Sequence, residues 1–168
     1  MSSIYKKYCN DIQNPALGAY AIASFVNEYK KEAEENKLPN LIHLFLFISM
    51  VMNKDIRNSI KKDNFKGKSG ILSIDRFLSE EIYKNHNSFG TLHNNIKNYR
   101  EYTLTSLIFA IRIGIISLTN NGEIDIVNLF KKYKQENYII SASEKMGKLF
   151  AKDPYSLNKI IIGTGVAL

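Results

Sequence analysis

Glu123 and Asp125 are the two carboxylates whose spacing comes closest to that of an acid–base or metal site. Residues two positions apart on a β-strand share a face, so both side chains are expected to point the same way. A nuclease site of this kind also needs a third acid or a lysine nearby. Lys131 is close in sequence, but no predicted strand places it beside the pair. We therefore interpret Glu123 and Asp125 as solvent-facing residues of a hairpin.

The other nucleophiles and metal ligands are isolated from one another. His43 lies in the most apolar stretch of the chain, where a lone histidine is typical of a hydrogen-bonded core residue. His86 and His93 are seven residues apart, but no acid or cysteine completes a metal-binding set with them. Cys9 is the single cysteine, and no histidine–aspartate pair is evident that could activate its thiol. We infer a chain that is not an enzyme and uses no metal or cofactor.

Gly67-Lys68-Ser69 has the last three residues of a phosphate-binding loop. The complete motif has another glycine five positions before Gly67, where Lys62 stands in this sequence. It also needs an apolar strand before the loop, and the segment that precedes it here is polar. We therefore predict a basic, flexible loop over residues 62–70.

Length and composition favour a single folded domain. The chain has 168 residues, of which 45% are hydrophobic and 23% charged, and these values exclude a disordered tail, a collagen-like fibre and a coiled-coil rod. Because there is one cysteine, an internal disulfide and a cysteine zinc site are excluded as well.

The basic residues gather in two places, and the net charge is +7. A contact with a nucleic-acid backbone is one interpretation, and lysine faces exposed to solvent are the other. The candidate phosphate contacts are Lys61, Lys62, Lys66, Lys68, Lys131, Lys132 and Lys134.

No targeting or membrane segment is expected. Residues 1–15 lack the apolar core of a signal peptide. The longest apolar stretches, Leu41–Met52 and Leu104–Leu118, are shorter than the roughly 20 residues that a membrane-spanning helix needs. We expect both to be buried helices of a cytoplasmic protein.

Capping residues and helical periodicity predict most of the elements. Asn14 can cap a helix that begins at Pro15, where the missing N–H of proline is harmless, and ends before Pro39. Leu41–Met52 is apolar on every side and predicts a central helix. Further helices are expected at Lys54–Lys61, Ile71–Tyr83, Thr91–Tyr99, Leu104–Ile113, Ser143–Ala151 and Tyr155–Ile162.

The one clear β signal lies in residues 115–127. Two short β-type runs flank Asn120-Asn121-Gly122, which is typical of a hairpin turn. Three helices followed by a hairpin have the order of a winged helix. The predicted fold is mainly α with one β-hairpin, a winged-helix-like helical domain. We expect one domain over residues 1–168, with N-terminal helices at 1–62, a winged-helix-like unit at 71–127 and C-terminal helices at 143–168.

The last predicted helix before the hairpin is poorly suited to reading DNA. Such a helix presents arginine, lysine, asparagine or glutamine along an exposed face. Leu104–Ile113 offers Thr105, Ser106 and Arg112 among apolar side chains. We therefore favour contacts with protein, and the candidate partner contacts are Arg112, Thr119, Asn120 and Asn121.

Four segments, in this order and spacing, carry a resemblance to a known family: Asn14–Leu17, Val51–Arg57, Arg100–Leu118 and Ala142–Ala151. Together they look like the middle component of bacterial ABC three-component systems. The small accessory subunit of Lamassu-type anti-phage and anti-plasmid defence belongs to the same group. The resemblance spans about residues 12–163.

The resemblance implies a role and no catalytic residue. It implies a non-catalytic adaptor that bridges an SMC/Rad50-like ABC ATPase and an effector, often a nuclease, in a defence complex. The hairpin and the +7 charge leave a winged-helix DNA-binding transcriptional regulator as the alternative.

Overall fold

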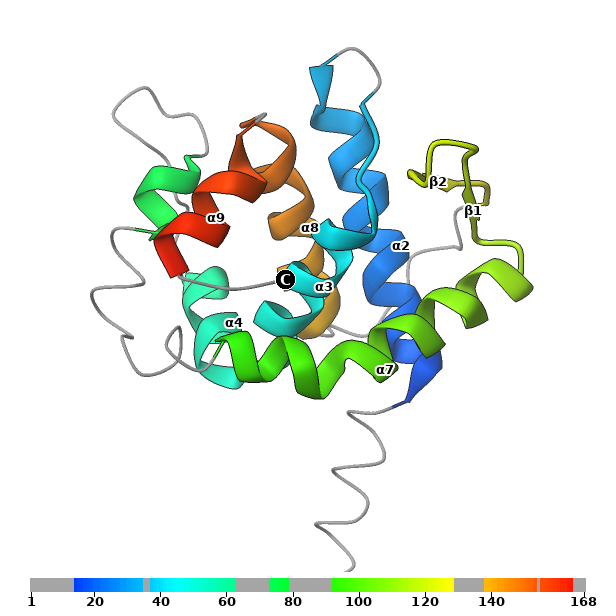
Figure 1. The fold of residues 1–168 in the computed structure, drawn as a ribbon, viewed down its shortest axis with the longest axis horizontal. Coiled ribbons are helices and arrows are strands. Elements are labelled where there is room, and N and C mark those ends of the chain that lie inside the picture. Colours follow the sequence, from blue (N-terminus) through cyan, green and yellow to red (C-terminus); the bar gives the residue numbers. More distant parts are fainter. Residues whose placement is uncertain are drawn as a thin grey trace, which may run out of the picture.

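The computed structural model describes residues 14–34, 37–62, 73–78, 92–128, 138–153 and 155–164. Its helices and strands follow one another as shown in Figure 1, with a short helical segment at residues 74–78. They are α2 (Pro15–Glu32), α3 (Leu41–Met52), α4 (Lys54–Lys62), α7 (Leu92–Arg112), β1 (Ile116–Leu118), β2 (Ile124–Ile126), α8 (Tyr138–Ala151) and α9 (Ser156–Thr164). The prediction of a mainly α fold with one hairpin is confirmed.

Helix α2 begins as its sequence predicts. The Asn14 side chain accepts a hydrogen bond from the backbone N–H of Ala16 at 2.9 Å, and Pro15 takes the first helical position. The helix ends at Glu32, earlier than Pro39 suggests, and Ala33 closes it by donating to the Tyr29 carbonyl oxygen. Its buried residues pack mainly against α8 and α7.

Helix α3 lies in the middle of the molecule, as expected from its apolar composition (Figure 1). Nine of its twelve residues are buried. Phe47 of α3 stacks on Phe25 of α2 with ring centroids 4.3 Å apart, and Phe150 of α8 meets Phe25 edge-on at 5.7 Å. Aromatic pairs in these geometries add to the burial of the rings, so the three helices share one core.

Helix α7 is continuous from Leu92 to Arg112, so the predicted break between Tyr99 and Leu104 is wrong. Thr103 and Thr105 lie at the predicted start of the second helix, and neither caps a helix there. Thr103 donates through its hydroxyl to the Tyr99 carbonyl oxygen, and Thr105 donates likewise to Glu101, both at 2.8 Å. A threonine whose hydroxyl donates to the carbonyl oxygen four residues back can lie in the interior of a helix.

Gly114 directly follows Ile113, where the sequence predicts the helix to end, and it turns the chain into the hairpin. Its φ of +72° lies in the left-handed region, which side chains other than glycine rarely adopt. The Gly114 N–H donates to Ile111, and the Ile115 N–H donates to Ala110, both at 3.0 Å. These are the two hydrogen bonds of a Schellman motif. In the hairpin Ile116 then pairs with Ile126, and Leu118 with Ile124.

Helix α8 begins at Tyr138, five residues before the predicted Ser143. The Ser143 hydroxyl is buried and donates to the Ile139 carbonyl oxygen at 2.8 Å, so it supports a helix interior and does not cap a start. Farther along, Gly147 lets α8 approach α2 closely. A Cβ at this position would overlap the backbone carbonyl oxygen of Phe25.

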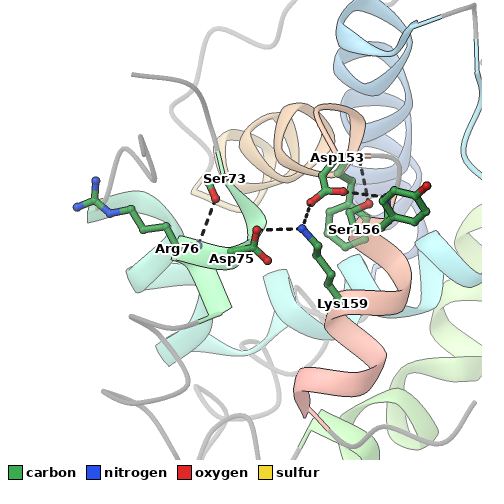
Figure 2. A network of polar contacts seen from close by, with 8 residues as sticks. Ser73, Asp75, Arg76, Asp153, Ser156 and Lys159 are labelled. Atoms are coloured by element: carbon green, nitrogen blue, oxygen red, sulfur yellow. Dashed lines mark hydrogen bonds and ion pairs between the residues drawn. The ribbon is translucent and has the colours of Figure 1, made fainter. Parts of the chain in front are cut away.

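Helix α9 is tied to the helical segment at residues 74–78 by a shared lysine (Figure 2). Lys159 Nζ lies 2.9 Å from Asp75 Oδ2 and 2.7 Å from Asp153 Oδ2. The remainder of the predicted helix Ile71–Tyr83 falls outside the described residues. The winged-helix-like arrangement of residues 71–127 and the division into three units therefore stay predictions.

Candidate protein-interaction surface

The hairpin is fixed to the connection between α2 and α3. The Ile124 N–H donates to the Pro39 carbonyl oxygen at 2.8 Å, and Glu123 forms an isolated β-bridge with Asn40. Lys30 Nζ of α2 lies 2.7 Å from Asp125 Oδ1 of β2. The interpretation of Glu123 and Asp125 as solvent-facing residues is therefore wrong, since both are half-buried where the hairpin meets the helices.

The turn of the hairpin leaves its tip in solvent. The Thr119 N–H donates to the Glu123 carbonyl oxygen at 2.8 Å, and the Thr119 hydroxyl oxygen accepts from the Glu123 N–H at 3.2 Å. Gly122 takes a φ of +74°, which this turn requires. Asn120 and Asn121 are exposed. Three candidate partner contacts thus lie together at the tip, which docking of the hairpin on α2 holds in place.

The exposed side of α7 changes from polar to apolar along the helix. As far as Thr105 its exposed residues are polar, among them Lys97, Asn98, Glu101 and Thr105 itself. In its last turns the exposed positions are apolar except for one arginine. We call this group the α7-end surface: Ile108 at 49% exposed, Phe109 at 38%, Ile113 at 44%, and the exposed Arg112.

The apolar exposure continues from α7 onto the hairpin. Leu118 of β1 is 51% exposed, and Val127, which follows β2, is 55% exposed. The Val127 N–H donates to the Ile115 carbonyl oxygen at 2.8 Å, which places it directly beyond the end of α7. Of the large hydrophobic side chains exposed among the described residues, more than half lie between positions 108 and 127. Grouped exposure of this kind is typical of interaction sites.

In Figure 1 the last turns of α7 extend past α2 toward the side on which the hairpin lies. Arg112 is the last residue of α7, and the hairpin follows it in the chain. Sequence reasoning named Arg112 and the tip residues as partner contacts but missed Ile108, Phe109 and Ile113. The sequence did contain a signal for their exposure, because Leu104–Ile113 is apolar on more sides than a single core can bury.

His43 is confirmed as a hydrogen-bonded core residue. The backbone N–H of Asn40 donates to His43 Nδ1 at 3.2 Å, and the Asn40 side chain accepts from the His43 N–H at 3.3 Å. The two residues thus form a capping box for α3. Burial lowers the pKa of His43 to about 4, so the ring is neutral at pH 7. The His43 ring also packs against the rings of Tyr29 and Phe150.

The remaining candidates for chemistry are scattered or lie outside the described residues. Cys9, His86 and Gly67-Lys68-Ser69 lie outside them. Within the described ranges no three histidine, cysteine or acidic side chains group as metal ligands would. Among the described helices, none combines the length and the apolar composition that crossing a membrane requires.

The predicted phosphate contacts are not placed by the structure. Lys66, Lys68, Lys131, Lys132 and Lys134 lie outside the described residues, and the side chains of Lys61 and Lys62 are not described either. Along α2 and α8 several other lysines are paired with acids. Lys31 and Lys148 both contact Glu28, and Lys152 contacts Glu32. In these pairs Glu28 and Glu32 offset part of the positive charge of the neighbouring lysines.

Comparison with protein families identifies the chain. Residues 2–167 match the family described as ABC-three component (ABC-3C) system Middle Component 3. The chain belongs to this family. Its resemblance to a middle component is thereby confirmed over nearly its whole length, and a middle component of a multi-component system has partner proteins. Neither the curated proteins nor the solved structures contain a match to this middle component.

Proposed function

We propose that this middle component is a non-catalytic adaptor that bridges an SMC/Rad50-like ABC ATPase and an effector nuclease. The assembly would be a Lamassu-type anti-phage or anti-plasmid defence complex in the prokaryotic cytoplasm. Membership of the middle-component family carries the proposal. The exposed apolar end of α7 and the exposed tip of the hairpin support it, because they offer surfaces for another protein.

The experiment is co-expression of this chain with the products of the neighbouring genes, followed by purification on this chain in high salt. We expect a long coiled-coil ATPase to co-purify together with an effector. High salt matters because it removes associations that rest on the basic charge of the chain alone. If the ATPase and the effector assemble equally well without this chain, the bridging role is wrong.

A winged-helix DNA-binding regulator is the second candidate, favoured by the hairpin that follows α7 and by the +7 charge. Base reading needs polar side chains on the exposed side of the recognition helix. At the end of α7, Ser106 is buried, and the exposed side chains are apolar apart from Arg112. This arrangement supports contact with protein over base reading.

Binding of DNA fragments over a range of salt concentrations separates the two candidates. A regulator binds one promoter fragment much more tightly than others of equal length. Weak binding that ignores sequence and falls steeply with salt indicates only backbone contacts. Recovery of the chain alone in co-expression, with a sequence-specific shift of one fragment, would favour the regulator.

A further inference from the structure

The side chains of the α7-end surface have the spacing found in helix–helix contacts. Ile108 and Arg112 form one row at i, i+4 spacing, and Phe109 and Ile113 form a second row beside it. Such rows are the ridges that fit into the grooves of a neighbouring helix. The Ile113 N–H still donates to the Phe109 carbonyl oxygen at 3.1 Å, so helical geometry reaches the end of the second row.

The charge of Arg112 limits which partner surfaces can cover the α7-end surface. Arg112 is its one charged side chain, and within the described ranges no acid pairs with it. Covering the apolar rows with an apolar surface would remove water from the guanidinium group without replacing its hydrogen bonds, which is costly. A carboxylate opposite Arg112 offsets this cost, because arginine and carboxylate form a two-pronged hydrogen-bonded pair.

A second copy of this chain fits the surface poorly. In a symmetric dimer the same patch meets itself, so the two Arg112 side chains would lie in one interface. The surface has no acid to separate them, and the net charge of +7 on each chain adds to the repulsion.

We propose that the α7-end surface binds an amphipathic helix of another protein of the system, with a carboxylate facing Arg112. The proposal rests on the adaptor function and adds the chemistry of the segment that is bound. The apolar side chains of the partner helix cover Ile108, Phe109 and Ile113. A stable interface buries about 800 Å² on each side. Three side chains cannot supply this area, so the contact extends over Leu118 and Val127 on the hairpin.

The test places a photo-cross-linking amino acid at Phe109 or at Ile113 of the full chain, co-expressed with the products of the neighbouring genes. Irradiation of the purified assembly and mass spectrometry identify the attached segment. We expect a segment of a different protein with apolar residues at helical spacing and an aspartate or glutamate within one turn. Attachment to a second copy of this chain, or to a segment without an acid, overturns the proposal.

Two substitutions measure how much the α7-end surface contributes to binding. Phe109→Ser should weaken the assembly about 30-fold, the size of a central interface residue, and Arg112→Glu should weaken it at least as much through charge repulsion. The matched controls are Ile162→Ser, an exposed apolar residue of α9, and Arg100→Glu on the polar half of α7. Both controls should leave affinity within about twofold.

The outcomes separate this inference from the adaptor function. If the assembly forms, and neither cross-linking nor the two substitutions affect this surface, the partner-helix proposal is wrong while the adaptor function stands. If no assembly forms with the unsubstituted chain, the adaptor function fails, and the partner helix fails with it. A circular dichroism spectrum of each variant, matching that of the parent chain, shows that loss of binding is not loss of folding.

Discussion

Lys30 and Asp125 are 95 residues apart in the chain, and their side chains meet at 2.7 Å from Nζ to Oδ1. The contact joins the last turns of α2 to β2. It lies beside the backbone hydrogen bond from Ile124 to Pro39, so the hairpin is held on the helices by an ion pair and by main-chain contacts together. The position of the hairpin tip, and of any partner bound there, depends on this junction.

Removing either member of this pair should loosen the hairpin with little effect on global stability. The two side chains are 38% and 30% exposed, and partly exposed pairs contribute roughly 0.2–1 kcal/mol. We expect Lys30→Ala and Asp125→Ala each to lower the free energy of unfolding in urea by less than about 1 kcal/mol. Amide hydrogen exchange at Ile124 should become faster in both.

The control for this pair is Lys97→Ala, which removes an exposed lysine from α7. Its amide exchange at Ile124 should match that of the parent chain. A double-mutant cycle then isolates the Lys30–Asp125 coupling. A coupling well above 1 kcal/mol, or unchanged exchange at Ile124, would show that the ion pair does not have the role assigned to it.

Gly147→Ala should be strongly destabilising, although alanine is the better helix former. The added Cβ overlaps the Phe25 carbonyl oxygen, and backbone cannot yield as a flexible side chain does. We expect a loss of about 2–3 kcal/mol in the free energy of unfolding, the upper range for overpacking. Thermal or urea denaturation measures it. Gly163→Ala, at an exposed position of α9, is the matched control and should be neutral or slightly stabilising.

Equal effects of the two glycine substitutions would contradict the close approach of α8 to α2. Propensity alone makes both changes favourable by up to about 1 kcal/mol, so a sign difference between them isolates the contact.

Stability should fall between pH 6.5 and pH 4 because of His43. Burial lowers the pKa of His43 from 6.5 to about 4, so in this window the unfolded chain binds a proton that the folded chain does not. Stability contributed by the neutral ring is complete above pH 6.5 and declines as the pH falls, by up to about 3 kcal/mol. Urea denaturation at pH 7 and at pH 5 measures the slope.

His43→Gln removes the titration and keeps an acceptor, because glutamine also serves at this capping-box position. The variant should be less stable at pH 7 through lost ring packing, with a flatter profile from pH 6.5 to 4.5. Glu28, whose pKa is lowered mainly by its lysine contacts in spite of burial, affects stability only at lower pH. An unchanged slope in the variant would assign the pH dependence to another group.

Gly114→Ala should disturb the link between α7 and the hairpin. No atom lies within 4 Å of a Cβ built at this position, so the cost arises from the positive φ alone and is about 1 kcal/mol. Gly114→Asn should cost less, because asparagine tolerates the left-handed region better. Denaturation midpoints give the order. If alanine and asparagine are equally harmful, the left-handed turn is not the reason for the glycine.

Local signals in the sequence determined where several elements begin and end. Asn14 and Pro15 define the start of α2, Gly114 the end of α7, and Asn120-Asn121-Gly122 the hairpin turn. Each acts through hydrogen bonds or a backbone angle within a few residues, so it can be recognised without the rest of the fold. The same holds for the apolar composition of α3, which predicts burial wherever the helix lies.

Tertiary structure decided what local signals leave open. Thr103 and Ser143 can either cap a helix or bond back to the preceding turn, and burial inside α7 and α8 selected the second. The amino-acid sequence makes the end of α7 apolar, but only the packing of α2, α3 and the hairpin around α7 determines that Ile108, Phe109 and Ile113 stay uncovered. Which side of such a helix stays exposed depends on where the neighbouring helices lie. The sequence of a helix that is apolar all round does not indicate this.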